Sequence, residues 1–474
     1  MNNNLAALLP ETALTAAAVL GLLAAGWLPR RRQWVIGVLA AAACATGLAA
    51  TGYGMAVDDE QTVFSEVFAV DTATGVGRLV VLGALLLVLA MSVEGVRGDR
   101  REAEYHVLLL LTGAGTLAMI GANDLLMLFA GYLLASIPAY ALAGFAKDGA
   151  GTEAALKYYL MGALLGTTML AGVALLYGAG EATLYPDLRD TLPGAPYGLV
   201  AVGLVAVLAG LLFKIGGVPA HFWVPDVTDG ATAPIAAYVT TLPKIGGLVA
   251  GFRLLHQAMP GTDVNWPLLL AILAAASMTL GNLAAFFQTS VKRLLAYSAI
   301  SQVGYLLMAL AVATRSDIAQ RALLFYLAAY AVTNLGAFAV VTELPHARTL
   351  DDYRGLARRR PALAAVLLVC LLGLLGTPPT AVFLGKLEVF TAAVDGGYTW
   401  LAALAVANTV ASLFYYLRWL GPLFHSAPGE QHVRAQAVAG RWSAATAYTA
   451  ATASLALGLA GGAVLPLTTG ALLR

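Results

Sequence analysis

The chain has 474 residues, of which 60% are hydrophobic and 11% are charged. Soluble domains carry about 25% charged residues, so this composition excludes a soluble globular protein. The formal net charge of +1 gives no reason to expect nucleic acid as a partner. Two isolated cysteines, Cys44 and Cys370, cannot supply the roughly four thiolates of an iron–sulfur cluster. No haem-attachment motif is present either, so we expect no redox centre in this chain.

Apolar segments of membrane-spanning length follow one another along the whole sequence. A helix that crosses a bilayer needs about 20 mainly apolar residues. The sequence predicts fourteen such spans, at about 5–28, 34–55, 76–96, 104–121, 123–146, 153–178, 196–217, 231–257, 266–288, 292–314, 319–342, 361–394, 398–422 and 441–471. The twelfth and fourteenth are long enough to break or to include a loop. We therefore expect an all-α integral membrane protein.

Lysine and arginine are unequally shared between the two sides of this predicted bundle. Cytoplasmic loops of membrane proteins are enriched in these residues. If the N-terminus faces outward, sixteen of them fall in inner loops, and four (Arg78, Arg189, Arg315 and Arg474) fall on the outer side. The bias predicts an even number of spans with both termini outside. No Lys or Arg precedes the first apolar stretch, so we expect no cleaved signal peptide.

Part of the sequence repeats. LLFKIGGVP (211–219) aligns with LLGLLGTPP (371–379), and ALKYYL (155–160) resembles ALLFYL (322–327) at a similar distance upstream. Equivalent spans are separated by five places, so the two copies have opposite orientation, as in transporters built from inverted repeats. The match is short, and chance similarity between helices rich in Leu and Gly is the alternative.

The repeat predicts four parts of the chain. They are three N-terminal spans (1–103), a first five-helix repeat (104–257), a second, inverted five-helix repeat (258–425) and a C-terminal span (426–474).

Glycine and proline interrupt the seventh and twelfth predicted spans. The interrupting residues are Gly216, Gly217 and Pro219 in the seventh span and Gly376, Pro378 and Pro379 in the twelfth. The backbone groups freed by such a break need protein or water partners, so a break within a membrane normally lines a cavity. We expect helix breaks, and space for water, at both positions.

Four lysines lie in or near apolar spans: Lys157, Lys214, Lys244 and Lys386. A lysine at a helix centre costs about 2.5–3.5 kcal/mol, and burial favours its neutral amine. We interpret these lysines as candidates for a proton relay. The alternative is that a long side chain near a helix end reaches the membrane interface, which applies most to Lys157 and least to Lys244.

Other polar residues in the spans have simpler interpretations. Arg253, Arg321 and Arg418 lie nearer helix ends and are interpreted as interfacial anchors, while the role of Glu388 is open. His221 follows the first break and is either a relay group or a structural histidine. The sequence contains no nucleophile motif, phosphate loop or metal-ligand cluster.

The stretch FKIGGVPAHFWVPDVTDGATAPIAAYVTTLPK (213–244) resembles the signature of the antiporter-like membrane subunits of respiratory complex I. The similarity extends over roughly residues 105–425 and includes EAALKYYLMGA (153–163), QTSVKRLLAYSAISQVGYLL (288–307) and FLGKLEVF (383–390). Among these subunits, the residues of the quoted stretches are most similar to subunit N of the proton-translocating NADH–quinone oxidoreductase.

This resemblance implies a subunit of a proton-translocating enzyme in the bacterial plasma membrane. Lys214 matches a switch lysine on the broken seventh helix, Lys244 a central relay lysine and Lys386 an exit lysine on the broken twelfth helix. Lys157 matches a supporting charge and His221 belongs to the same signature. The family implies that quinone, FMN and iron–sulfur clusters are held by partner subunits, with M-like and K-like membrane subunits and the lipid bilayer as neighbours.

Two positions depart from the family pattern. Leu133 stands where the family has a glutamate that pairs with the lysine matched by Lys214, and Gln302 stands where histidine is common. Proton transfer through Lys244 and Lys386 is one interpretation. The alternatives are a non-pumping structural scaffold subunit, or a subunit of a cation/proton antiporter or membrane hydrogenase of the same fold.

Overall fold

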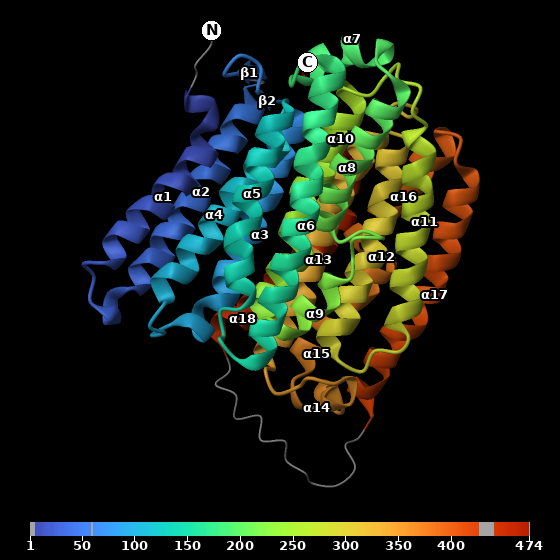
Figure 1. Cartoon of the computed structure of the whole chain (residues 1–474). Helices are drawn as coiled ribbons and strands as arrows, with labels where there is room; N and C mark the ends of the chain where they lie inside the picture. The colour runs from blue at the N-terminus through green and yellow to red at the C-terminus, as the bar shows by residue number, and fades with distance from the viewer. Residues whose placement is uncertain (1–4, 58–59, 426–439, 474) are drawn as a thin grey trace.

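The computed structural model describes residues 5–57, 60–425 and 440–473. Arg474, counted above on the outer side, and Arg434, one of the sixteen inner residues, lie outside the described residues. Within these ranges the chain is built almost entirely of helices that run side by side (Figure 1). The prediction of an all-α membrane protein is confirmed.

Twelve helices of the described part are long and apolar enough to cross a membrane. They are α1 (Leu9–Ala25), α2 (Trp34–Ala56), α3 (Thr72–Val96), α4 (Glu102–Gly121), α5 (Leu125–Ala143), α6 (Gly149–Gly180), α8 (Tyr197–Ile215), α10 (Ala233–Gln257), α11 (Trp266–Ala285), α12 (Val291–Ala311), α13 (Ala319–Glu343) and α17 (Thr399–Phe424).

The two longest predicted spans are divided. The segment predicted at 361–394 forms α15 (Pro361–Leu375) and α16 (Ala381–Asp395), each of 15 residues. The last segment forms α18 (Arg441–Leu459), then α19 (Gly461–Val464) and a 3-10 turn to Thr468, with a bend of 78°. The count of fourteen crossings therefore stays a prediction, which requires α15 and α16 to act as one span.

Short elements connect the long helices. They are the helices α7 (Tyr185–Thr191), α9 (Trp223–Gly230) and α14 (Leu356–Arg359), and the antiparallel strands β1 (Gln61–Val63) and β2 (Phe68–Val70), in which Thr62 pairs with Ala69. The hairpin lies next to the start of α3 and was not predicted, because its strands are only three residues long.

Side chains that accept hydrogen bonds from free backbone N–H groups fix several helix starts. Asp71 accepts from Thr74 at α3, Asp124 from Leu126 and Met127 at α5, and Asp148 from Gly151 at α6. Proline stands in the first turn of α1, α10, α11 and α15, where its missing N–H has no partner to lose.

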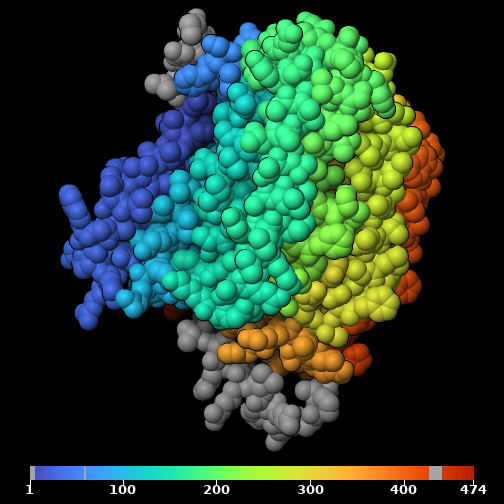
Figure 2. All heavy atoms as spheres, viewed as in Figure 1, coloured from blue at the N-terminus to red at the C-terminus, as the bar shows by residue number. Residues whose placement is uncertain are grey.

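The core lies around α10, α12 and α13. Within the apolar window of each helix, 100%, 94% and 89% of residues are buried, against 28% and 33% for α1 and α2. Accordingly, α1 and α2 form one flank of the molecule, and α11 and α17 form the other (Figures 1 and 2). A helix enclosed on all sides must find partners for its polar side chains inside the protein.

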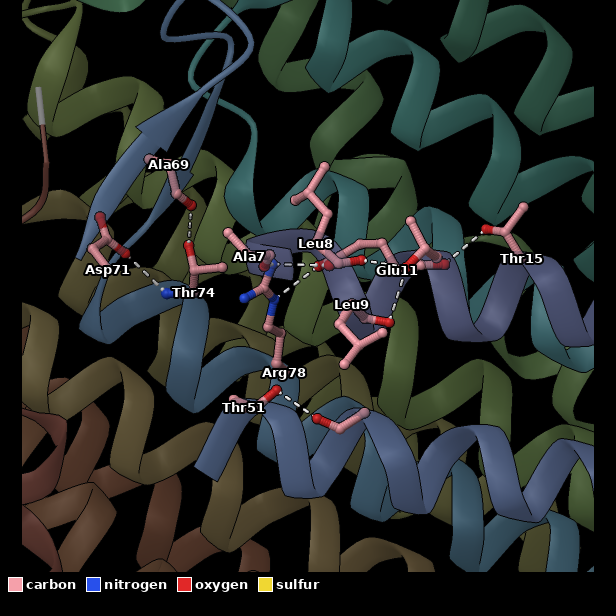
Figure 3. A network of polar contacts seen from close by, with 12 residues as sticks. Ala7, Leu8, Leu9, Glu11, Thr15, Thr51, Ala69, Asp71, Thr74 and Arg78 are labelled. Atoms are coloured by element: carbon pink, nitrogen blue, oxygen red, sulfur yellow. Dashed lines mark hydrogen bonds and ion pairs between the residues drawn. The ribbon is translucent and has the colours of Figure 1, made fainter. Parts of the chain in front are cut away.

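Both described ends of the chain meet the start of α3. Arg78 on α3 donates to Glu11 at 2.8 Å and to the carbonyl of Ala7 at 3.0 Å (Figure 3). The backbone N–H of Leu473 donates to Asp71 at 3.1 Å. The two ends therefore lie at the same end of the bundle, as an even number of crossings requires.

The interpretation of Arg253 as an interfacial anchor is wrong. Its side chain on α10 is fully buried and forms two hydrogen bonds of 2.8 Å with Asp71, which is also fully buried. A third bond of 3.0 Å joins Arg253 to Thr74. Because Asp71 also binds the C-terminal tail, this ion pair ties α3, α10 and the end of the chain together.

Replacing Arg253 by methionine is expected to destabilise the protein by about 3–5 kcal/mol, because Asp71 would remain as an unpaired buried charge. The thermal transition of the detergent-solubilised protein measures this. The double variant Arg253→Met/Asp71→Leu should recover much of the loss. Arg354→Met is the control: its exposed pair with Asp351 is worth at most about 1 kcal/mol. Equal effects of Arg253→Met and Arg354→Met would contradict the assignment.

Candidate functional site

Two helix breaks with the same backbone geometry lie in the interior. α8 ends at Gly216 (φ +74°) and α15 ends at Gly376 (φ +90°), both in the left-handed region that glycine adopts without cost. At each end an N–H bonds to the carbonyl five residues back, from Gly217 to Leu212 and from Thr377 to Leu372. Pro219 and Pro378–Pro379 follow within the two connections. Both helices therefore end in the same way, in a Schellman motif with a left-handed glycine.

Each break receives the ammonium group of a lysine. The Lys244 Nζ, from the middle of α10, donates to the carbonyl of Ile215 at 2.5 Å. The Lys386 Nζ, from α16, donates to the carbonyl of Leu375 at 2.8 Å. Each acceptor is the residue just before the left-handed glycine, so the two lysines occupy matching places.

The absence of a side chain at these glycines makes room for the lysines. A Cβ on Gly216 would lie 3.3 Å from the Lys244 Nζ and 2.6 Å from a methyl group of Val224. A Cβ on Gly376 would lie 2.9 Å from the Cδ of Lys386. The glycines are therefore required twice, for the backbone conformation and for the space in front of it.

Lys214 has a different kind of partner. It lies two residues before Gly216 in the last turn of α8, is 1% exposed, and donates to the hydroxyl of Ser136 on α5 at 2.8 Å. Its Nζ also lies 5.6 Å from the centre of the Tyr132 ring, a favourable place for a cation. No carboxylate of the described residues forms an ion pair with Lys214, Lys244 or Lys386.

Lys157 belongs to a separate, partly exposed charged cluster. It pairs with Glu153 and Asp226, each at 2.7 Å, and Asp226 also pairs with Arg293 at 2.7 Å. The cluster joins α6, α9 and α12. No described ion pair links this cluster to Lys214, Lys244 or Lys386.

His221 and the other charged residues have local partners. The His221 ring lies beside Phe222, with 4.3 Å between ring centres, and no described hydrogen bond joins it to the lysines. Glu388, whose role was open, pairs with Arg321 at 2.9 Å. Arg418 donates to the carbonyl of Gln288 at 2.9 Å and also to that of Phe286.

The two positions that depart from the family pattern lie in different surroundings. Leu133 is 37% exposed, on the face of α5 that points away from the protein interior. Ser136, three residues further along α5, faces Lys214. Gln302 is buried on α12, donates to the carbonyl of Leu374 at 2.8 Å and accepts from Tyr326. Gln302 therefore binds the last turn of α15, next to the second break.

Sequence reasoning missed the polar residues that lie between the two breaks. On α13, Tyr330 donates to the carbonyl of Thr240 at 2.7 Å, and Asn334 donates to Thr241 at 2.8 Å; both acceptors are on α10. Tyr326, one turn before Tyr330 on α13, lies against Gly385, the neighbour of Lys386. These residues connect α10 to α16, but single Tyr, Thr and Asn residues in apolar helices carry no distinctive sequence signal.

A second polar group lies beside Lys386. Its Nζ is 4.4 Å from the centre of the Tyr305 ring and 3.5 Å from the hydroxyl of Thr409, which donates to the Tyr305 hydroxyl at 3.4 Å. In the part of the chain that the structure describes, no three His, Cys, Asp or Glu side chains gather as metal ligands. The arrangement can hold and pass protons between amines, hydroxyls and water.

Comparison with known proteins agrees with this arrangement. The family model for the membrane-spanning part of NADH:quinone oxidoreductase and Mrp antiporters matches residues 122–412. Subunit N 1 of NADH-quinone oxidoreductase from Streptomyces griseus subsp. griseus is 56% identical over 465 residues, which cover 98% of each chain. The chain belongs to the subunit N family of NADH-quinone oxidoreductases.

Further relatives support the assignment. Subunit N from Mycobacterium sp. strain JLS is 51% identical over 459 residues, covering 97% of each chain. A chain of respiratory complex I from Thermus thermophilus, solved with bound aureothin, superposes with a TM-score of 0.82 at 31% identity, over 98% of this chain and 100% of that one. The resemblance drawn from the sequence is confirmed, and the protein is an antiporter-like membrane subunit of complex I.

Replacing Gly216 by alanine is expected to destabilise this member of the subunit N family by at least about 1–2 kcal/mol, the cost of a left-handed residue with a Cβ. The crowding against Val224 adds to this. Gly198→Ala is the control, because Gly198 lies in α8 with open space around it, where alanine stabilises a helix by up to about 1 kcal/mol. Thermal unfolding of both variants in detergent tests this, and equal transitions would contradict the described geometry.

Proposed function

We propose that this subunit translocates protons through its buried lysines, coupled to quinone reduction elsewhere in the complex. Lys214, Lys244 and Lys386 are the relay, with Lys214 as the switch, Lys244 as the central relay and Lys386 as the exit relay. Lys157 supports the relay as a surface charge. His221, whose ring lies beside Phe222, is proposed as a further proton-relay group.

The burial of three lysines without carboxylate partners carries this proposal. A lysine inside a membrane protein costs several kcal/mol unless its charge is compensated. Lys244 and Lys386 have carbonyl oxygens as their close partners, and Lys214 has a hydroxyl. These groups bind the ammonium form without neutralising it, so each lysine can both hold and release a proton, which suits a relay better than a scaffold.

The polar residues of α13 support a continuous route. Tyr330 and Asn334 contact α10 near Lys244, and Tyr326 lies beside the helix that carries Lys386. Hydroxyl and amide groups, with water between them, can pass protons over distances that two lysines alone cannot bridge. The matched breaks of α8 and α15 also support the proposed inverted repeats, 104–257 and 258–425, flanked by the parts 1–103 and 426–474.

The proposal extends to the setting of the subunit. M-like and K-like subunits are its neighbours in the bacterial plasma membrane, and FMN, iron–sulfur clusters and quinone are bound in partner subunits. The Arg-rich loops face the cytoplasm, with both termini outside. The identities of 51–56% to proteins named as subunit N favour this complex over a cation antiporter or a membrane hydrogenase.

Replacing Lys386 by methionine is expected to lower the number of protons translocated per electron pair while the complex stays assembled, because methionine fills the space without holding a proton. Membrane vesicles with the native complex, in which NADH oxidation and proton uptake are followed together, provide the measurement.

The exposed Lys147, two residues before the start of α6, offers a control, since Lys147→Met removes a lysine outside the relay. Full pumping in an assembled Lys386→Met complex would favour the scaffold interpretation.

A further inference from the structure

Lys214 donates to a side-chain hydroxyl at 2.8 Å, whereas Lys386 donates to a carbonyl at 2.8 Å and reaches a hydroxyl only at 3.5 Å. A main-chain carbonyl, such as those that bind Lys244 and Lys386, accepts a hydrogen bond but has no proton to give. A serine hydroxyl is both donor and acceptor and can rotate between the two roles. We propose that Ser136, with the Tyr140 hydroxyl behind it, delivers protons to Lys214. The proposal deepens the proposed function and rests on it.

The position of Ser136 suits this role. Its side chain is buried on α5, accepts from the Lys214 Nζ at 2.8 Å and donates to the carbonyl of Tyr132 at 2.6 Å. Rotation of the hydroxyl away from the Tyr132 carbonyl points its proton at the lysine. The same atom then serves the lysine as acceptor in one state and as donor in the other.

Tyr140 lies on the same side of α5, one helical turn further along. The hydroxyl of Tyr132, on the same face of α5, donates to the carbonyl of Gly162 on α6 at 3.4 Å, and the Tyr140 hydroxyl lies in the same region. The space that it occupies is provided by Gly162 of α6, where an added Cβ would lie 2.0 Å from the Tyr140 oxygen. A glycine at this position leaves room for a hydroxyl group between α5 and α6.

A route from Tyr140 to the surface runs along α6. The rings of Tyr140 and Tyr159 lie 6.0 Å apart, and Tyr159 is 54% exposed. The charged cluster of Lys157, Glu153 and Asp226 lies on the same part of α6. We take water at this end of α6 as the proton source, with the carboxylates of Glu153 and Asp226 beside it.

The proton balance of the step is simple. The neutral amine of Lys214 takes the proton of the Ser136 hydroxyl, so one O–H bond breaks and one N–H bond forms. Ser136 regains a proton from the Tyr140 hydroxyl, and Tyr140 regains one from protonated water at the α6 surface. The result is one proton moved to Lys214, with both hydroxyls restored.

Two variants of α5 test the proposal in the assembled complex in vesicles. Ser136→Ala and Tyr140→Phe each remove one hydroxyl, and each is expected to lose as many protons per electron pair as Lys386→Met. Ser136→Thr keeps the hydroxyl and is expected to pump as many protons per electron pair as the unmodified complex. If altered packing alone caused the loss, Ser136→Thr would lose pumping as well.

The chain offers a matched control pair. Ser92 on α3 is buried, bonds to the carbonyl four residues back at 2.7 Å and contacts the hydroxyl of Tyr105 at 2.7 Å, but no lysine is bound to it. Ser92→Ala and Tyr105→Phe are expected to pump like the unmodified complex.

The outcomes separate this inference from the proposed function. Full pumping by Ser136→Ala and Tyr140→Phe, with loss in Lys386→Met, overturns the hydroxyl relay and leaves the lysine relay standing. Full pumping by all three variants overturns both. Loss in the Ser92→Ala control equal to that in Ser136→Ala assigns the effect to packing and also overturns the hydroxyl relay.

Discussion

A lysine ammonium held against the last carbonyl of a broken helix is the interaction on which this structure depends. The final carbonyls of a helix lack backbone partners and carry the negative end of the helix dipole. Inside a membrane they must be satisfied by protein or water. Lys244 and Lys386 satisfy them at the two breaks. Each unfavourable group, a buried cation and an open carbonyl, thereby offsets the cost of the other.

This pairing explains the residues around it. The glycine after each carbonyl must turn left-handed and leave space for the lysine. Trp223 donates to the carbonyl of Phe213 at 3.1 Å, and Gln302 donates to that of Leu374, so side chains also serve the earlier carbonyls of both last turns. The frame that holds the breaks is tied elsewhere, by Arg253 and Asp71 where α10 meets α3.

Much of this site could be predicted from the sequence because its components are conspicuous there. A lysine within an apolar span stands out by its cost, and Gly216 and Gly376 stand out as helix breakers. Arg253 stands out too, but the sequence cannot tell an arginine that reaches the interface from one paired with Asp71, some 180 residues away in the chain. Ser136 carries no comparable signal in the sequence, since its contact with Lys214 is a tertiary one.

Leu133 also shows that a sequence alone does not reveal the tertiary partner of a buried lysine. Comparison with the family motif predicts that Lys214 lacks its carboxylate partner. In the structure, the hydrogen-bond partner of Lys214 is the hydroxyl of Ser136. A single sequence reveals which residue has been replaced, but not which neighbouring group has taken over the contact. That depends on how α5 packs on α8, which is set by side chains spread over both helices.

The central claim is that protons cross this subunit through Lys244, which lies between the two other buried lysines in the sequence and binds the first break. The most direct test measures protons translocated per electron pair in vesicles with the native complex and with Lys244→Ala, following electron transfer in the same sample. The account predicts a lower ratio in an assembled complex. An unchanged ratio in an intact complex would contradict it.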